Sequence, residues 1–182
     1  MPLTKAARRY ATALLELAQE RNELDDILED IKFIDNTLEG SRELVLFLKS
    51  PIIKYDDKIN VLNELFSSEV KEATKLFMNL LVKKERVNLL DQITKAFIEK
   101  YKQLAGIITV EVYVAHELSD EQREALHNQL EEKTQKKVDM NITQDESLRG
   151  GMAVRIDDTV IDGTVKHKLE ELEESLLATT LE

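Results

Sequence analysis

The spacing of apolar residues changes once along this 182-residue chain, near Gly106, and this change divides the chain into two modules of different kinds. Before it, apolar residues recur every three or four positions, the period of a helix with one buried face. After it, they alternate with polar residues over short runs, the period of a half-buried strand. Composition changes at the same point: residues 1–105 hold all five phenylalanines and 17 basic against 18 acidic residues, whereas residues 106–182 hold 8 basic against 18 acidic. The sequence therefore predicts an α+β protein with two modules, residues 1–105 and 106–182.

The first module is predicted to be a six-helix antiparallel bundle. Its clearest helical stripe consists of Leu24, Ile27, Leu28, Ile31, Ile34 and Leu38. Ser41 is placed to cap the next helix, which Pro51 prevents from continuing. A long last helix is predicted from a second stripe, formed by Leu90, Ile93, Phe97, Tyr101 and Leu104.

Two of these helices are apolar around more of their circumference than one buried stripe requires. In the first helix the apolar residues are Ala6, Ala7, Tyr10, Ala11, Ala13, Leu14, Leu15, Leu17 and Ala18. In the fifth they are Ala73, Leu76, Phe77, Met78, Leu80, Leu81 and Val82. Such coverage indicates either a central position in the bundle or a second partner that packs from outside, and the pattern alone favours neither.

The second module is predicted to be a small α+β domain. Alternating residues predict strands at 108–114, 138–142, 152–156 and 159–162. Ser119 and Gln122 form a capping box at the start of a helix between the first two strands. A final helix is predicted from a stripe of Val165, Leu169, Leu172 and Leu176, whose first three residues form an inner side that we expect to pack on the sheet. Leu176, Leu177 and Leu181 exceed what this inner side requires, and the pattern is compatible both with packing on the sheet and with contact to a partner.

Composition and motifs exclude several classes of function. The absence of cysteine excludes thiolate chemistry, and a formal charge of −11 argues against nucleic acid as the main partner. The longest apolar run, residues 44–48, is too short to span a bilayer. Gly150-Gly151 lacks the surroundings of a phosphate loop and predicts a tight turn. We therefore expect a soluble, intracellular, acidic protein with no catalytic residues, no cofactor and no metal site.

Several short motifs occur together in a fixed order. They are Ala7-Arg8-Arg9-Tyr10-Ala11, Phe47-Leu48, Ser50-Pro51-Ile52, Leu80-Leu81, Leu148-Arg149-Gly150-Gly151 and Val160-Ile161-Asp162-Gly163-Thr164-Val165. This ordered set resembles the delta subunit family of F-type ATP synthases, which includes the mitochondrial oligomycin sensitivity-conferring protein. The resemblance covers nearly the whole chain and both modules.

The resemblance implies a non-catalytic stator subunit, peripheral on the cytoplasmic face of the bacterial cell membrane without inserting into it. The N-terminal domain would bind N-terminal helices of the alpha subunits in a groove between the first and fifth helices. The candidate groove residues are Ala7, Tyr10, Ala11, Leu14, Ala18, Phe77, Met78 and Leu81. The C-terminal domain would hold the b subunits of the peripheral stalk, with apolar contacts expected from Leu176, Leu177 and Leu181.

Two other classes of function are compatible with the composition. An enzyme would require a pocket with convergent polar groups, and an activity screen would detect it. A free-standing acidic adaptor or chaperone would also be helical and acidic. Recovery of assorted clients from cells, rather than ATP synthase subunits, would identify that class.

Overall fold

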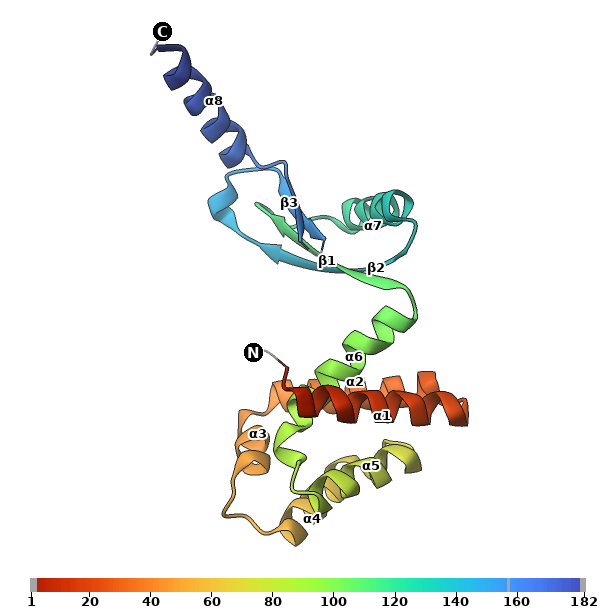
Figure 1. Cartoon of the computed structure of the whole chain (residues 1–182). Coiled ribbons are helices and arrows are strands. Elements are labelled where there is room, and N and C mark those ends of the chain that lie inside the picture. Colours follow the sequence, from red (N-terminus) through yellow and green to blue (C-terminus); the bar gives the residue numbers. More distant parts are fainter. Residues whose placement is uncertain (1–2, 157, 181–182) are drawn as a thin grey trace. The chain divides into compact units, whose positions relative to one another are not determined.

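The chain folds into two compact units, Met1–Leu104 and Ala105–Glu182, which we call the helical unit and the sheet unit. The structure is a computed structural model that describes residues 3–156 and 158–180, with side chains described outside 174–180 (Figure 1). It confirms the α+β class, with a helical region followed by a small sheet domain. None of the described helices is both long and apolar enough to cross a membrane.

The described part of the helical unit contains six α helices and one short 3₁₀ turn. They are α1 (Lys5–Arg21), α2 (Leu24–Gly40), α3 (Arg42–Lys49), α4 (Tyr55–Phe66), α5 (Glu72–Lys83), η1 (Val87–Leu89) and α6 (Leu90–Leu104). The predicted cap is present, since the Leu44 backbone N–H donates to Ser41 Oγ at 3.2 Å. Helix α6 packs mainly against α1 and α2, while α5 packs mainly against α4.

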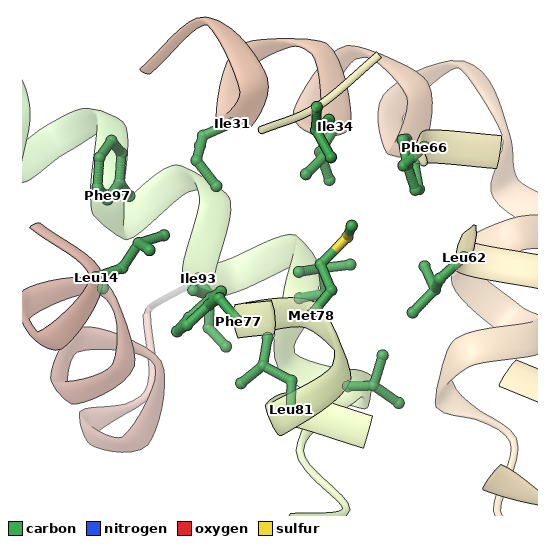
Figure 2. Close-up of a cluster of buried hydrophobic side chains, with 14 of the residues drawn as sticks. Leu14, Ile31, Ile34, Leu62, Phe66, Phe77, Met78, Leu81, Ile93 and Phe97 are labelled. Atoms are coloured by element: carbon green, nitrogen blue, oxygen red, sulfur yellow. The ribbon is translucent and has the colours of Figure 1, made fainter. Parts of the chain in front are cut away.

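One apolar cluster joins the helices of this unit. It includes Leu14 from α1, Ile31 and Ile34 from α2, Phe77 from α5 and Ile93 from α6 (Figure 2). Each of these residues is almost fully buried, so each removes apolar area from water and favours the folded state.

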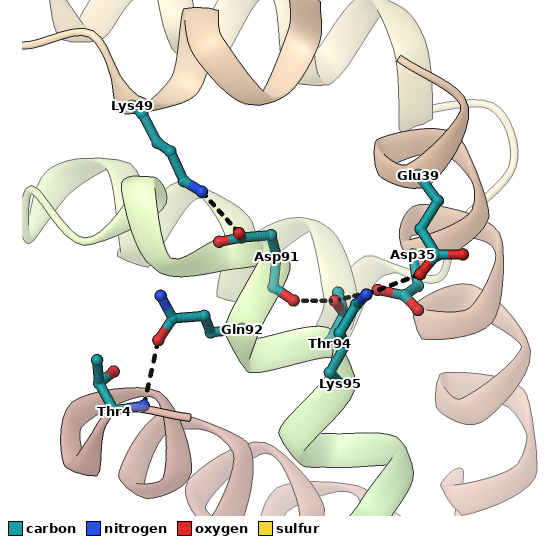
Figure 3. A network of polar contacts seen from close by, with 8 residues as sticks. All are labelled: Thr4, Asp35, Glu39, Lys49, Asp91, Gln92, Thr94 and Lys95. Atoms are coloured by element: carbon teal, nitrogen blue, oxygen red, sulfur yellow. Dashed lines mark hydrogen bonds and ion pairs between the residues drawn. The ribbon is translucent and has the colours of Figure 1, made fainter. Parts of the chain in front are cut away.

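Polar side chains on α6 connect it to three other helices (Figure 3). The Thr4 backbone N–H, just before α1, donates to Gln92 at 3.2 Å, and Lys49 of α3 pairs with Asp91 at 2.7 Å. The Thr94 hydroxyl donates to Asp35 of α2 at 2.6 Å. Burial raises the pKa of Asp35, and this hydrogen bond partly offsets the rise. These contacts fix the orientation of α6, against which α1 and α2 pack.

The sheet unit contains four strands and two helices in its described part. They are β1 (Ile107–Val114), α7 (Asp120–Thr134), β2 (Lys137–Gln144), the 3₁₀ turn η2 (Glu146–Leu148), β3 (Met152–Ile156), β4 (Thr159–Asp162) and α8 (Val165–Thr180). The strand order is β2-β1-β3-β4; β1 and β2 are parallel and the other pairs antiparallel. A parallel pair needs a crossover, and α7 supplies it. The capping box of Ser119 and Gln122 is present with both hydrogen bonds.

A close backbone contact joins the start of β3 to the start of α8. Gly151 has φ +75°, and a Cβ there would lie 2.5 Å from the Gly163 carbonyl oxygen. The Val165 backbone N–H donates to the Gly150 carbonyl at 2.9 Å. The glycine pair therefore lies in the tight turn that the sequence predicts. Position 151 requires glycine, because a side chain there would overlap the backbone of Gly163.

The first turn of α8 is capped by the Thr164 side chain, and Asp162 holds Thr164 in place. The His167 backbone N–H donates to Thr164 Oγ1 at 3.1 Å, and Thr164 is almost fully buried. The Thr164 backbone N–H donates to Asp162 Oδ1 at 2.9 Å, which lowers the pKa of Asp162. Because the folded pKa is lowered, this contribution to stability is present at neutral pH and is lost as pH falls through the folded pKa.

The expected packing of α8 on the sheet is wrong. Val165, Leu169 and Leu172 are 42%, 46% and 56% exposed, and α8 packs mainly against η2. The turn that joins β4 to α8 directs the helix away from the sheet (Figure 1), so the apolar stripe does not reach the core around Val110 and Val112.

Candidate functional site

The candidate residues on α1 lie mostly on the inner side of the helix. Ala7, Ala11, Leu14 and Ala18 are each 0% exposed and belong to the apolar cluster of the helical unit. Tyr10 is half-buried and packs against the edge of the same cluster. The four buried side chains contact the bundle itself, mainly because α6 packs along this side of α1.

The candidate residues on α5 are also internal. Phe77, Met78 and Leu81 are at most 7% exposed and belong to the apolar cluster, where Phe77 lies beside Ile93 of α6 (Figure 2). A partner outside the unit would not reach them while the bundle is closed. The assignment of these seven buried residues to a partner-facing surface is therefore corrected: they are core residues.

Each of the two helices carries a second set of apolar residues that are not fully buried in the core. On α1, the set is Ala6, Tyr10, Ala13 and Leu17, with spacings of four, three and four residues; all four are half-buried or exposed. On α5, Leu76 is 54% and Leu80 is 43% exposed, one turn apart. We call these two sets the α1 outer stripe and the α5 outer pair. These residues account for the apolar coverage beyond one buried stripe that the sequence pattern indicated on both helices.

A buried carboxylate fixes the start of α5. Lys71, the N-cap of α5, makes no side-chain cap of its own. Instead, Asp30 of α2 accepts from the Lys71 backbone N–H at 2.8 Å and from the Thr74 hydroxyl at 2.6 Å. Asp30 is only 6% exposed, and the N-terminus of a helix stabilises a nearby negative charge. Sequence reasoning missed Asp30 because its role depends on a contact 41 residues away.

Replacing Asp30 by Ala is expected to loosen the start of α5 and to lower the free energy of unfolding by about 1–3 kcal/mol, since a buried hydroxyl and a part-buried backbone N–H lose their acceptor. Asp26 offers a matched control on the same helix, because it pairs with the exposed Lys71 ammonium at 3.4 Å. Asp26→Ala is expected to cost less than about 1 kcal/mol. Urea denaturation and hydrogen exchange of the α5 amides measure both; equal effects of the two variants would contradict the capping role.

The side chains of the candidate stalk-binding residues lie outside what the structure describes. Leu181 is not described, and neither are the side chains of Leu176 and Leu177. The described part of α8 that precedes them carries the exposed stripe of Val165, Leu169 and Leu172.

A hollow of about 600 Å³ lies beside the α3–α4 connection. Lys58, one of its lining residues, is buried, and its ammonium donates to the carbonyls of Leu48 and Ser50 at 2.8 Å each. Lys49 is paired with Asp91. Since both ammonium groups already have structural partners, we assign no reaction to this hollow. Within the described residues, no three His, Asp or Glu side chains come together as a metal site.

The sequence and the fold were compared with known proteins. Residues 6–176 match the family model described as ATP synthase delta (OSCP) subunit. The chain is 45% identical over 173 residues to an ATP synthase subunit delta from Chlorobaculum parvum, covering 95% of this chain and 96% of that protein. It is 42% identical over 178 residues to the protein of the same description from Chlorobium chlorochromatii, covering 98% and 99%.

A solved structure has the same fold. A chain in the cryo-EM structure of the Toxoplasma gondii mitochondrial ATP synthase hexamer matches with a TM-score of 0.75 and 22% identity, over 96% of this chain and 98% of that chain. At this level of identity the likeness concerns the fold.

Proposed function

Because the chain belongs to the ATP synthase delta (OSCP) subunit family, we propose that it is the stator subunit that links the catalytic head of an F-type ATP synthase to its peripheral stalk. The helical unit binds N-terminal helices of the alpha subunits, and the sheet unit binds the b subunits. This linkage prevents the head from turning with the rotor, so that proton-driven rotation is coupled to ATP synthesis. The protein itself performs no catalysis and associates with the cytoplasmic face of the membrane through the complex.

The observation that carries the head-binding role is the pair of incompletely buried apolar sets on α1 and α5. An amphipathic helix laid against another apolar surface is a common mode of protein recognition. The α1 outer stripe has the spacing of one helix face, and Leu76 and Leu80 lie one turn apart on α5. We propose that the alpha-subunit helix contacts these outer residues and not the buried ones.

Reconstitution tests the whole function. The purified chain, added to membranes stripped of their own delta subunit, is expected to restore proton-driven ATP synthesis. Restored head attachment without coupled synthesis would contradict the stator role. Binding of assorted unfolded clients by the free chain, without binding to ATP synthase subunits, would favour a chaperone.

Replacing Leu80 by Glu is expected to weaken binding of a synthetic alpha-subunit N-terminal peptide by about tenfold or more, because a charge would be buried against the peptide's apolar face. Leu65 of α4 is a matched control, since it is 42% exposed against 43% for Leu80. Leu65→Glu is expected to bind like the wild type. Isothermal titration calorimetry with the full chain measures both affinities. If both substitutions weakened binding equally, Leu80 would not belong to the docking surface.

The charge of the sheet unit supports its role at the stalk. Residues 106–182 carry 18 acidic against 8 basic residues, whereas residues 1–105 are nearly balanced. Such a field attracts a basic partner and raises its association rate in a salt-dependent way. We propose that apolar contacts complete the attachment, with Leu176, Leu177 and Leu181 among them.

A further inference from the structure

We propose that the outer edge of β2 binds an extended segment of a partner protein, which pairs with β2 as an additional strand. The segment carries an apolar residue with basic residues two positions before and after it. The surface consists of the outward backbone groups of Met140, Ile142 and Gln144 and the hollow beside them, and we call it the β2 edge site. It goes beyond the proposed function, which assigns no partner to this edge.

Hydrogen bonds at both ends of β2 show which way its backbone groups point. The Val138 backbone N–H donates to Glu131 Oε1 at 3.1 Å, and the Val138 carbonyl accepts from His127 Nε2 at 3.0 Å. These two side chains, one turn apart on α7, occupy the place that a neighbouring strand would have. Just after β2, the Asp145 backbone N–H donates instead to the Val114 carbonyl of β1 at 2.8 Å. Even-numbered positions of β2 therefore point away from the sheet and odd-numbered ones toward β1.

The rest of the β2 edge is open. Strand β2 is the outer strand beside β1, so its far side has no neighbouring strand (Figure 1). Met140, Ile142 and Gln144 direct their N–H and C=O groups to the same side as Val138. Within the described part of the chain, no group outside the sheet is hydrogen-bonded to these outward backbone groups. An unpaired edge of this kind is a template for another strand.

A hollow of about 370 Å³ lies beside the open edge. Met140, Ile142 and Leu118 contribute to its lining and are half-buried, so part of the apolar cluster around Val110 remains accessible there. In an added strand, every second side chain would point to the face of the sheet that carries the side chains of Met140 and Ile142. One apolar side chain of the segment would enter the hollow. Backbone pairing supplies affinity in this mode of recognition, and the hollow supplies specificity.

The charges around the hollow favour a basic segment. Glu117 and Arg123 line it, and both are exposed. The first turns of α7, which carry Arg123, also carry Asp120, Glu121 and Glu124, all exposed. Acidic side chains therefore outnumber basic ones on the side of the sheet that α7 covers. Lysines two positions from the apolar residue lie on that side too and are attracted to this excess, whereas a second copy of this chain would bring the same acidic excess and be repelled.

The first test is an NMR titration of the full chain with a short synthetic peptide. Its central leucine has lysine two positions away on each side, and the remaining residues are threonine, which favours an extended backbone. We expect the amide signals of Met140, Ile142 and Gln144 to shift more than those of Asn141 and Thr143, whose N–H groups point toward β1. Hydrogen exchange of the three outward amides is expected to slow by about tenfold once the edge is mostly occupied. Replacing both lysines by glutamate is expected to abolish these changes.

Methylation of the peptide backbone separates strand pairing from other modes of binding. N-methyl groups on one alternate set of peptide residues, whose N–H groups face β2, are expected to weaken binding by about tenfold or more. The same groups on the other alternate set are the matched control and are expected to leave the affinity unchanged. Gln144→Pro removes one outward N–H at an edge, where proline is tolerated, and is expected to weaken binding of the unmethylated peptide by a similar factor.

Three results would overturn the proposal. The first is the absence of peptide-induced changes at the three outward amides of the wild-type chain. The second is an equal loss of affinity from both alternate sets of N-methyl groups, which would mean that side chains alone bind the peptide. The third is a wild-type dimer in analytical ultracentrifugation that Gln144→Pro converts to a monomer, because a second copy would then occupy the edge. The methylated peptides keep the test decisive if Gln144→Pro fails to fold, as judged by circular dichroism.

Discussion

Replacing Ala11 by Asp is expected to destabilise the helical unit strongly. Ala11 is 0% exposed on the inner side of α1, within the apolar cluster of that unit. A carboxylate there would be buried without a partner, which we expect to cost about 3 kcal/mol or more. The whole stability of a domain is about 5–15 kcal/mol, so this loss is a large part of it. Hydrogen exchange of the full chain, followed peptide by peptide, is expected to show lost protection in α1 and α6 and unchanged protection in the sheet unit.

Ala13 provides the control for this prediction, because it is exposed on the same helix. Ala13→Asp is expected to lower stability by less than about 1 kcal/mol, the difference in helix propensity. Ala13 belongs to the α1 outer stripe, so the same variant is expected to bind the alpha-subunit peptide more weakly while staying folded. If Ala11→Asp stayed fully folded and lost only peptide binding, Ala11 would face the partner and the inner and outer sides of α1 would be exchanged.

Replacing Gly151 by Ala is expected to lower the free energy of unfolding of the sheet unit by about 3 kcal/mol, from the strained left-handed backbone and the overlap of Cβ with backbone. The added Cβ would lie 2.5 Å from the Gly163 carbonyl oxygen and 3.2 Å from Thr164 Cα. Neither of these backbone atoms moves without disturbing the start of α8. Urea denaturation of the full chain, with hydrogen exchange to assign the transition to the sheet unit, measures the loss.

Gly106 separates the two causes of this effect. Its φ of +67° is close to the +75° of Gly151, but a Cβ at Gly106 would have no neighbour within 4 Å. Gly106→Ala is therefore expected to cost only about 1 kcal/mol, from backbone strain alone. Equal losses in the two variants would mean that the close contact between β3 and α8 contributes nothing.

Local sequence signals predicted elements whose causes lie within a few residues. The Ser41 cap and the Ser119–Gln122 capping box are present because each involves hydrogen bonds between residues three apart. The four strands were predicted from alternation, although their order was not, because pairing partners are distant in sequence. Asp30 was missed for the same reason, since the two groups that donate to its carboxylate, the Lys71 backbone N–H and the Thr74 hydroxyl, lie at the start of α5.

The apolar surfaces of α1, α5 and α8 follow from the sequence, because helical periodicity is a property of the chain alone. Which of these surfaces are buried depends on how the neighbouring elements pack. Helices α1 and α5 each have apolar residues on two sides, and only one side of each is buried. On α1 the buried side contains Ala11, and α6 is its main neighbour; on α5 the buried side contains Leu81, and α4 is its main neighbour. On α8, the single stripe stays exposed because the Gly151–Gly163 contact and the Thr164 cap set the direction of the helix. Periodicity gives the angle between residues on a helix, whereas burial depends on where neighbouring elements lie.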